Sequence, residues 1–309
     1  MKTAFLFPGQ GAQYPGMARD LFDASPAVRD LFSLASDSTG IDVQHLLFEG
    51  TEEELKETVN TQVSVTLANL SSALVLADRG IRSDGTAGFS LGEYAALVEA
   101  GVLTAAQVFP LVKLRGELMS KAAAALDRSA GDPGMAAVLG LSPEKVDEAL
   151  ATASIPDLYG ANYNSPNQVV ISGTAAALTA GIDALKAAGA RRVVTLKVSG
   201  PFHSPLLADA GQALEAALKS IEFQNPKKAL FSNVTGGLVT SGADAKALAV
   251  RQVTAPVRWT TEEKALVDAG FTRFIEAGPG AVLAGLWGAF QETLPCYAAG
   301  KLEQIDQIG

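Results

Sequence analysis

Gly88-Phe89-Ser90-Leu91-Gly92 is the stretch around which the rest of the chain can be organised. A serine with a glycine two residues away on either side fits a nucleophile elbow, in which a strand turns sharply into a helix and exposes the serine hydroxyl. The flanks agree, because the small residues at 85–88 can end a strand and the sequence at 93–98 predicts a helix that stops at Gly101. The same pattern also occurs in ordinary glycine-rich turns, so other parts of the chain must decide between the two interpretations.

The composition is that of an acidic globular protein. The chain has 309 residues, 48% of them hydrophobic, which suffices for one large domain or two modest ones. A net charge of −9 opposes a phosphate backbone and argues against a broad nucleic-acid surface. The first apolar run is too short for a signal peptide, and no later run of spanning length lacks glycine, proline or charge. We therefore expect a cytoplasmic protein that does not enter a membrane.

Cysteine and histidine are scarce. Cys296 is the single cysteine, which excludes an internal disulfide and a cysteine-based metal cluster. His45 and His203 are the only histidines, which argues against a histidine-rich metal site.

Strands alternate with helices along most of the chain, which predicts an α/β fold with a mostly parallel sheet. A buried first strand at 2–7 leads into the loop Gly9-Gln10-Gly11, but Tyr14 stands where a dinucleotide-binding loop needs its third glycine. The patterns further predict helices at 17–34 (interrupted at Ser25-Pro26), 52–79, 104–126, 206–220, 244–253 and 281–290, and strands at 229–233 and 271–276.

The composition shifts after a polar linker at 127–134. The following residues predict strands and helices in the order βαββαβ, at 135–139, 143–151, 159–163, 168–172, 175–188 and 192–198. This is the order of a ferredoxin-like unit. We therefore expect a ferredoxin-like subdomain at 131–197, inserted into a larger α/β domain formed by 1–130 and 198–309, with the functional site in the cleft between them.

Two further residues can serve chemistry at Ser90. A serine needs a neighbouring base, and His203 lies in a strand-to-helix loop of the kind that carries catalytic groups, whereas His45 lies in or beside an amphipathic helix. Arg115 falls on the apolar stripe of the helix predicted at 104–126. A cation there requires either an internal salt bridge with a distant acid or the carboxylate of a substrate.

Five motifs, in order and spread over nearly the whole chain, resemble those of the malonyl-CoA:acyl carrier protein transacylase family. They are Gly9-Gln10-Gly11-Ala12-Gln13, Gly88-Phe89-Ser90-Leu91-Gly92-Glu93-Tyr94, Arg115-Gly116-Glu117-Leu118-Met119, Gly200-Pro201-Phe202-His203-Ser204, and Arg251-Gln252 followed by Pro256-Val257-Arg258-Trp259. The fold of this family, an α/β-hydrolase-like large domain with an inserted ferredoxin-like subdomain, agrees with the pattern above.

The resemblance implies an acyltransferase that works through a Ser–His dyad. Ser90 would attack the thioester of malonyl-CoA, and His203, oriented by the backbone carbonyl of Gln252, would take its proton. The backbone N–H groups of Gln10 and Leu91 would hold the tetrahedral oxyanion. The malonyl-serine would then pass its acyl group to the phosphopantetheine thiol of acyl carrier protein in a ping-pong reaction, without metal or redox cofactor, to supply extender units for fatty acid synthesis.

The resemblance also assigns two substrate-binding residues. Arg115 would pair with the free malonyl carboxylate. Phe202 would disfavour an α-methyl branch and so select malonyl over methylmalonyl, or it simply packs its loop. Two positions depart from the family pattern, since Phe89 replaces the common histidine and Ala255 a frequent asparagine.

Other functions stay open at this point. A serine thioesterase or esterase would place its acid before the histidine, whereas Asp268 and Glu276 follow His203. A non-catalytic acyl-carrier or acyl-CoA-binding module, in which Ser90 is inert, and a trans-acting acyltransferase of polyketide synthesis are further alternatives. We expect a monomer that docks an acidic carrier protein through a local basic surface. Clustering in the sequence suggests Arg191, Arg192, Lys197, Lys227 and Lys228 for that surface.

Overall fold

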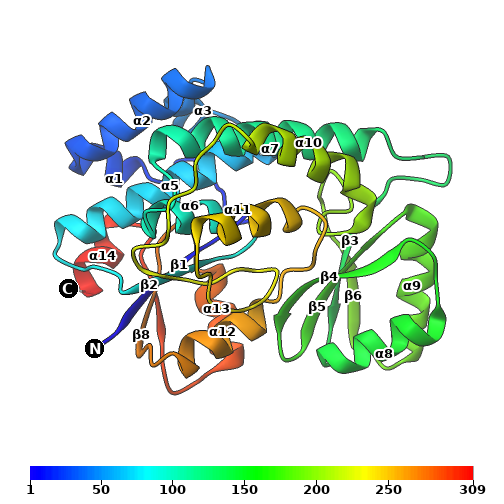
Figure 1. The fold of residues 1–309 in the computed structure, drawn as a ribbon. Coiled ribbons are helices and arrows are strands. Elements are labelled where there is room, and N and C mark those ends of the chain that lie inside the picture. The colour runs from blue at the N-terminus through cyan, green and yellow to red at the C-terminus, as the bar shows by residue number, and fades with distance from the viewer. Residues whose placement is uncertain (309) are drawn as a thin grey trace.

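A computed structural model describes residues 1–308, which form two separate sheets (Figure 1). The larger sheet has five strands in the order β7-β2-β1-β8-β9, and all of its strand pairs are parallel. The strands are β1 (Thr3–Phe7), β2 (Gly85–Gly88), β7 (Ala229–Leu230), β8 (Arg273–Glu276) and β9 (Cys296–Ala298). Every residue of β1 and β2 is buried, as expected for central strands of a parallel sheet that is covered on both faces.

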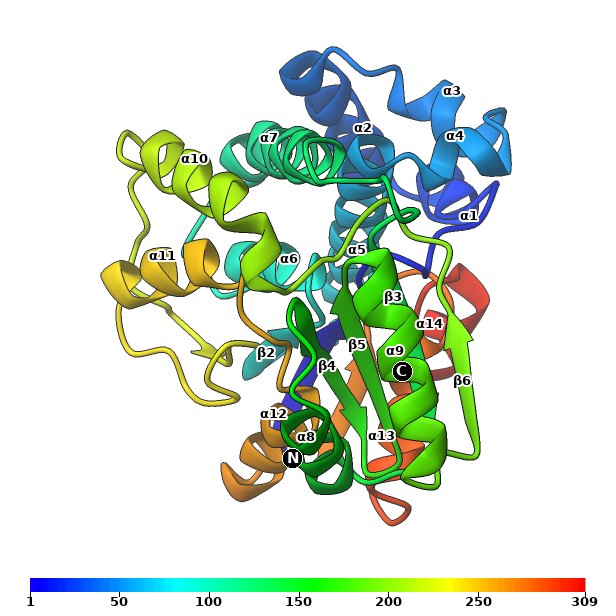
Figure 2. The same cartoon turned by 90° about the vertical axis from the view of Figure 1, so that its right-hand side faces the viewer.

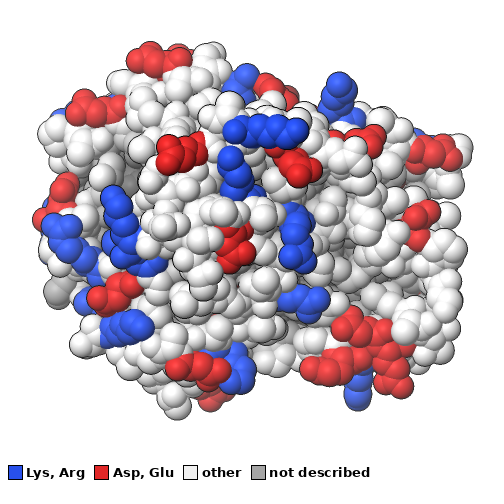
Figure 3. Space-filling view, viewed as in Figure 1, with Lys and Arg blue, Asp and Glu red and all other residues white. Residues whose placement is uncertain are grey.

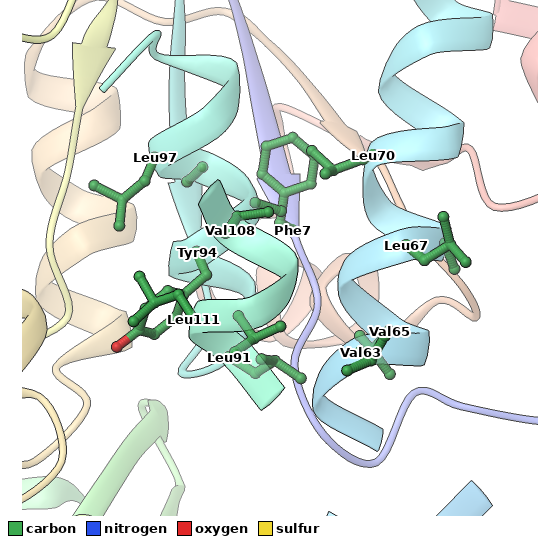
Figure 4. Packing of buried hydrophobic residues seen from close by; sticks show 14 of the residues in the cluster. Phe7, Val63, Val65, Leu67, Leu70, Leu91, Tyr94, Leu97, Val108 and Leu111 are labelled. Atoms are coloured by element: carbon green, nitrogen blue, oxygen red, sulfur yellow. The ribbon is translucent and has the colours of Figure 1, made fainter. Parts of the chain in front are cut away.

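The main hydrophobic core lies between this sheet and the helices on one side of it. Its centre is α5 (Thr58–Asp78), which is buried nearly all round and packs against α6 (Gly92–Glu99) and α7 (Ala105–Ala124). Figure 4 shows Phe7 of β1 between Leu70 of α5 and Val108 of α7. Capping boxes at Thr51 and Thr104 start α4 (Glu52–Lys56) and α7.

The remaining helices of the larger part surround this core and the second face of the sheet. They are α1 (Arg19–Ala24), α2 (Pro26–Thr39), α3 (Val43–Phe48), α10 (Ala208–Leu218), α11 (Gly242–Arg251), α12 (Trp259–Asp268), α13 (Val282–Phe290) and α14 (Leu302–Ile308). Within residues 1–308, no helix is long and apolar enough to cross a membrane.

The smaller sheet is antiparallel and has the order β4-β5-β3-β6. It consists of β3 (Gly134–Leu139), β4 (Leu158–Ser165), β5 (Gln168–Gly173) and β6 (Arg192–Thr195), with α8 (Pro143–Ala153) and α9 (Ala175–Ala187) on the face directed away from the larger sheet (Figures 1 and 2). This confirms the ferredoxin-like fold of the second part. Its boundaries at residues 131 and 197 stay a prediction.

Several elements differ from the sequence prediction. The helix expected at 52–79 is two helices, because Glu57 has an extended ψ of 129°. The helix expected at 206–220 begins as a 3₁₀ turn at Pro205–Leu207 and continues as α10. The sequence pattern predicts no element at α12, β9 or α14. Strand β9 has three residues at the sheet edge, and α12 begins with Trp-Thr-Thr, whose side chains favour strands.

Candidate active site

Ser90 lies in the turn between β2 and α6, where its φ angle is 51°. The two glycines of the motif are required there by close backbone approach. A Cβ atom on Gly88 would lie 2.1 Å from the carbonyl carbon of Gly92, and one on Gly92 would lie 1.9 Å from the carbonyl oxygen of Phe7. The chain therefore makes the sharp strand-to-helix turn that places a serine hydroxyl at the carboxyl edge of a parallel sheet.

His203 lies beside this serine, with its Nε2 2.7 Å from Ser90 Oγ. On the other side of the ring, Nδ1 lies 2.9 Å from the carbonyl oxygen of Gln252 and 3.2 Å from that of Ala255. Both partners of Nδ1 are acceptors, so Nδ1 carries the proton and Nε2 is free to accept one from the serine. The two carbonyls stand where a triad would have a carboxylate, and they fix the tautomer in its place.

The pKa of His203 supports a role for this residue as a general base. Burial of the ring and the nearby charge of Arg115 lower this pKa from 6.5 to about 4. The imidazole is therefore neutral at physiological pH and able to accept the serine proton.

The loop after β1 lies against the elbow. A Cβ atom on Gly9 would lie 2.4 Å from the carbonyl oxygen of Phe89 and 3.5 Å from the Leu91 nitrogen, so the two loops are in contact. Within residues 1–308, neither the Gln10 N–H nor the Leu91 N–H donates a hydrogen bond. Two free backbone donors beside a serine nucleophile can stabilise an oxyanion.

Arg115 reaches the same cavity from α7 although only 1% of it is exposed. Its Nη1 donates to Gln62 Oε1 at 2.7 Å and its Nη2 to Gln252 Oε1 at 3.1 Å, while the guanidinium lies 5.3 Å from the centre of the Tyr94 ring. No carboxylate of residues 1–308 forms an ion pair with it. The internal salt bridge considered from the sequence is thus absent, and the buried cation is held by neutral amides.

The cavity has a volume of about 220 Å³ and lies between the two sheets. Phe202, 6% exposed, contributes to its wall next to His203. The smaller sheet and the segment after it contribute apolar side chains together with three amides; these residues are Met135, Asn162, Asn164, Gln168, Val170, Leu196 and Val198. The site therefore lies in the expected cleft. Within the described residues, no group of three or more His, Cys, Asp or Glu side chains could hold a metal ion.

Gln62, Asn233 and Glu93 also belong to this site, although the sequence did not single them out as site residues. Gln62 is a partner of Arg115, and Asn233 Oδ1 accepts a hydrogen bond from the Ser90 N–H at 2.6 Å. Glu93 Oε2 accepts hydrogen bonds from the Asn233 N–H at 2.8 Å and from Gln252 Nε2 at 3.0 Å. One signal was available for Asn233, since it ends the strand predicted at 229–233, and parallel sheets bind their ligands beyond the carboxyl ends of strands.

The structure shows what the residues at the two departures from the family pattern contact. Phe89 packs edge-to-face on Trp259, with the ring centres 5.5 Å apart. The Ala255 carbonyl is the second acceptor beside His203 Nδ1, which involves no side chain.

The structure separates the five basic residues that the sequence grouped. Arg191 and Arg192 lie at the start of β6, whereas Leu196 and Val198, which flank Lys197, line the cavity beyond its end. Lys227 and Lys228 precede β7, at the amino-terminal edge of the sheet, and Lys228 is paired with Glu99. Only Lys197 of the group lies beside the cavity. Figure 3 shows basic side chains along the boundary between the two parts of the molecule and an acidic group over α8.

A serine at a strand-to-helix turn, a buried histidine beside it and two free backbone donors form the arrangement that serine-dependent acyl-transferring and acyl-hydrolysing enzymes use. Residues 4–303 match the family model of the acyl transferase domain. The malonyl CoA-acyl carrier protein transacylase of Bacillus subtilis is 38% identical, with 99% of this chain and 95% of the relative covered. The enzyme of the same name from Staphylococcus aureus strain COL is 39% identical, with 98% and 97% covered.

Comparison with solved structures points to the same family. The malonyl CoA-acyl carrier protein transacylase of Clostridium perfringens has a TM-score of 0.94 at 34% identity, covering 100% of this chain and 96% of that one. A malonyl-transacylase in complex with its type II polyketide synthase acyl-carrier protein has a TM-score of 0.94 at 37% identity, covering 99% and 98%. The chain belongs to the malonyl CoA-acyl carrier protein transacylases of the acyl transferase family.

Proposed function

We propose that this protein transfers the malonyl group of malonyl-CoA to the phosphopantetheine thiol of acyl carrier protein through a malonyl-Ser90 intermediate. The observation that carries the proposal is the guanidinium of Arg115, buried without a carboxylate partner among residues 1–308, in the cavity that also contains Ser90 and His203. A malonyl group differs from acetyl and other uncharged short acyl groups in its free carboxylate, and a planar guanidinium can bind a carboxylate through two parallel hydrogen bonds.

In the first half-reaction, Ser90 Oγ attacks the thioester carbonyl carbon while His203 Nε2 takes the hydroxyl proton. The carbonyl oxygen becomes an oxyanion, which accepts hydrogen bonds from the Gln10 and Leu91 N–H groups. When the tetrahedral intermediate collapses, the C–S bond breaks, and His203 returns the proton to the departing CoA thiolate. The carbonyls of Gln252 and Ala255 hold the ring in the required tautomer throughout.

The second half-reaction reverses these roles with a new thiol. The phosphopantetheine thiol of the carrier protein gives its proton to His203 and attacks the malonyl-serine ester, and the Ser90 alkoxide that leaves is protonated by the same ring. The nucleophilic serine, the base and the oxyanion donors that serve both halves belong to this chain, and we assign no metal or redox cofactor to the reaction. The monomeric state and cytoplasmic location expected from the sequence stay predictions.

Intact-mass measurement tests the proposal directly. Incubation with malonyl-CoA should add one malonyl group to the wild-type protein and none to Ser90→Ala, and adding holo acyl carrier protein should move that group to the carrier. Turnover to free malonate without a carrier would indicate a thioesterase instead. A protein that binds malonyl-CoA without any adduct would be a binding protein, and the proposal would be wrong.

A further inference from the structure

The backbone of Ser90 is held by two side chains from distant parts of the chain. Its N–H donates to Asn233 Oδ1 at 2.6 Å, and its carbonyl accepts from Gln252 Nε2 at 3.0 Å. The φ angle of 51° places this serine in the left-handed region, which residues other than glycine occupy only when the surroundings hold them there. The hydrogen bonds to Ser90 therefore act on a strained residue.

Asn233 also holds the residue that precedes the turn. Its Nδ2 donates to the Gly88 carbonyl oxygen at 2.7 Å, so a single side chain joins the end of β2 to Ser90. A turn fixed at both of these points cannot relax toward an unstrained φ without breaking one of the two hydrogen bonds. Gln252 bonds the elbow backbone at one point, the Ser90 carbonyl, whereas Asn233 bonds it at two.

The Asn233 amide is itself fully partnered, which fixes its orientation. Its Nδ2 donates a second hydrogen bond to Glu262 Oε2 at 2.7 Å, and its Oδ1 is also 3.2 Å from Gln252 Nε2. Exchanging the oxygen and the nitrogen would place donors against donors and acceptors against acceptors. The backbone N–H of Asn233 is bound to Glu93 and its carbonyl to the Arg258 N–H. With the residue fully buried, the side chain has little freedom to turn.

We infer that Asn233 is a positioning residue for the nucleophile: it holds the Ser90 backbone in the strained conformation that directs Oγ at His203. By occupying the Ser90 N–H, it also leaves the next N–H, that of Leu91, as the free donor at the turn. Asn233 does not touch the reacting atoms. The inference rests on the proposed function of Ser90 as the nucleophile, and it concerns a residue that acts through Ser90.

Three substitutions separate positioning from packing. Asn233→Leu keeps the branched shape of the side chain, with somewhat greater bulk, but removes its hydrogen bonds. Asn233→Ala removes both the shape and the side-chain hydrogen bonds. Asn233→Asp keeps an acceptor for the Ser90 N–H while placing an oxygen against the Gly88 carbonyl. Since displacements of about 1 Å cost about 100-fold in rate, we expect a loss of that order in the serine acylation rate for Leu and Ala, and a smaller loss for Asp. If packing were the whole role, Leu would retain more activity than Ala.

The matched control is Ser232→Ala. Ser232 precedes Asn233 and bonds to Glu93 and to the Val234 N–H but does not contact the elbow. The Ser232→Ala variant should therefore be acylated at a rate near that of the wild type. Malonyl-CoA affinity is measured in the Ser90→Ala background, with and without Asn233→Leu, and should be unchanged because Arg115 is intact. Thermal denaturation shows whether each variant is folded. If Asn233→Leu does not fold, the test relies on Asn233→Asp.

The result that overturns the inference is a folded Asn233→Leu or Asn233→Asp variant that acylates at the wild-type rate. A loss of rate explained entirely by weaker malonyl-CoA binding would overturn it as well. A wild-type protein that forms no malonyl-serine would instead disprove the proposed function, so the two failures can be told apart.

Discussion

Replacing Arg115 tests how the protein distinguishes malonyl groups from uncharged acyl groups. Its two Nη atoms are already held by Gln62 and Gln252, so a carboxylate meets a guanidinium fork that is fixed in place. Each charge-assisted hydrogen bond contributes about 1.5–3 kcal/mol. Losing two therefore costs about 3–6 kcal/mol, which is roughly 10²- to 10⁴-fold in kcat/KM for malonyl-CoA. Arg115→Lys keeps the charge but loses the fork, so we expect a loss of roughly 10- to 100-fold.

The assay compares serine acylation by malonyl-CoA and acetyl-CoA in Arg115→Ala, Arg115→Lys and the wild type. Acetyl groups have no distal carboxylate, so their kcat/KM should change little, and selectivity should shift toward acetyl. Lys113→Ala, on the same helix and paired with Glu117 at the surface, is the control and should leave both rates unchanged. Equal losses of kcat/KM with both substrates would refute the reasoning, because the arginine would then support the structure of the site without binding the malonyl carboxylate.

Three further predictions follow from the surroundings of single residues. The lowered pKa of His203, about 4, should keep the acylation rate constant on acidification until the pH approaches that value; a limb centred near the unperturbed value of about 6.5 would contradict it. Burial raises the pKa of Glu263 to about 8, so this group destabilises the fold increasingly as pH rises from 4.5 through 8. Glu263→Gln should therefore raise the melting temperature more at the alkaline end of this range than at pH 4.5. An equal rise at every pH would contradict this prediction. Phe202→Ala should raise the kcat/KM ratio of methylmalonyl-CoA to malonyl-CoA by roughly 10- to 200-fold, and an unchanged ratio would mean that Phe202 only packs its loop.

The fold was largely predictable because its signals are local. Turn residues such as Asn164-Ser165-Pro166-Asn167 bracket the short strands of the smaller sheet, and polar capping residues start several helices. Where the prediction was incomplete, the reason is tertiary. The helix at Trp259–Asp268 begins with residues of strand propensity and is stabilised by burial of Trp259, which no local pattern reveals.

The site was predictable only in part. Ser90 stands in a motif with its own geometry, and His203 was singled out because the chain has just one other histidine. Gln62 has no such signal, and Asn233 has only its place at the end of a predicted strand, since amides occur throughout the sequence and their partners in the site lie 53 and 143 residues away. Sequence clustering also failed for the basic residues, because a strand carries its two ends to different parts of the surface.

The surroundings of Arg115 suggest why its partners are amides. A carboxylate in direct contact would have satisfied the buried cation, and a malonyl group would then have had to displace it. Instead, Gln252 stands between the guanidinium and Glu93, accepting from one through Oε1 and donating to the other through Nε2. Burial raises the pKa of Glu93 to about 7, so this carboxyl balances the cation only in part at neutral pH. The free site thus retains an incompletely balanced positive charge in a fixed orientation, and the carboxylate of the substrate supplies the missing negative charge.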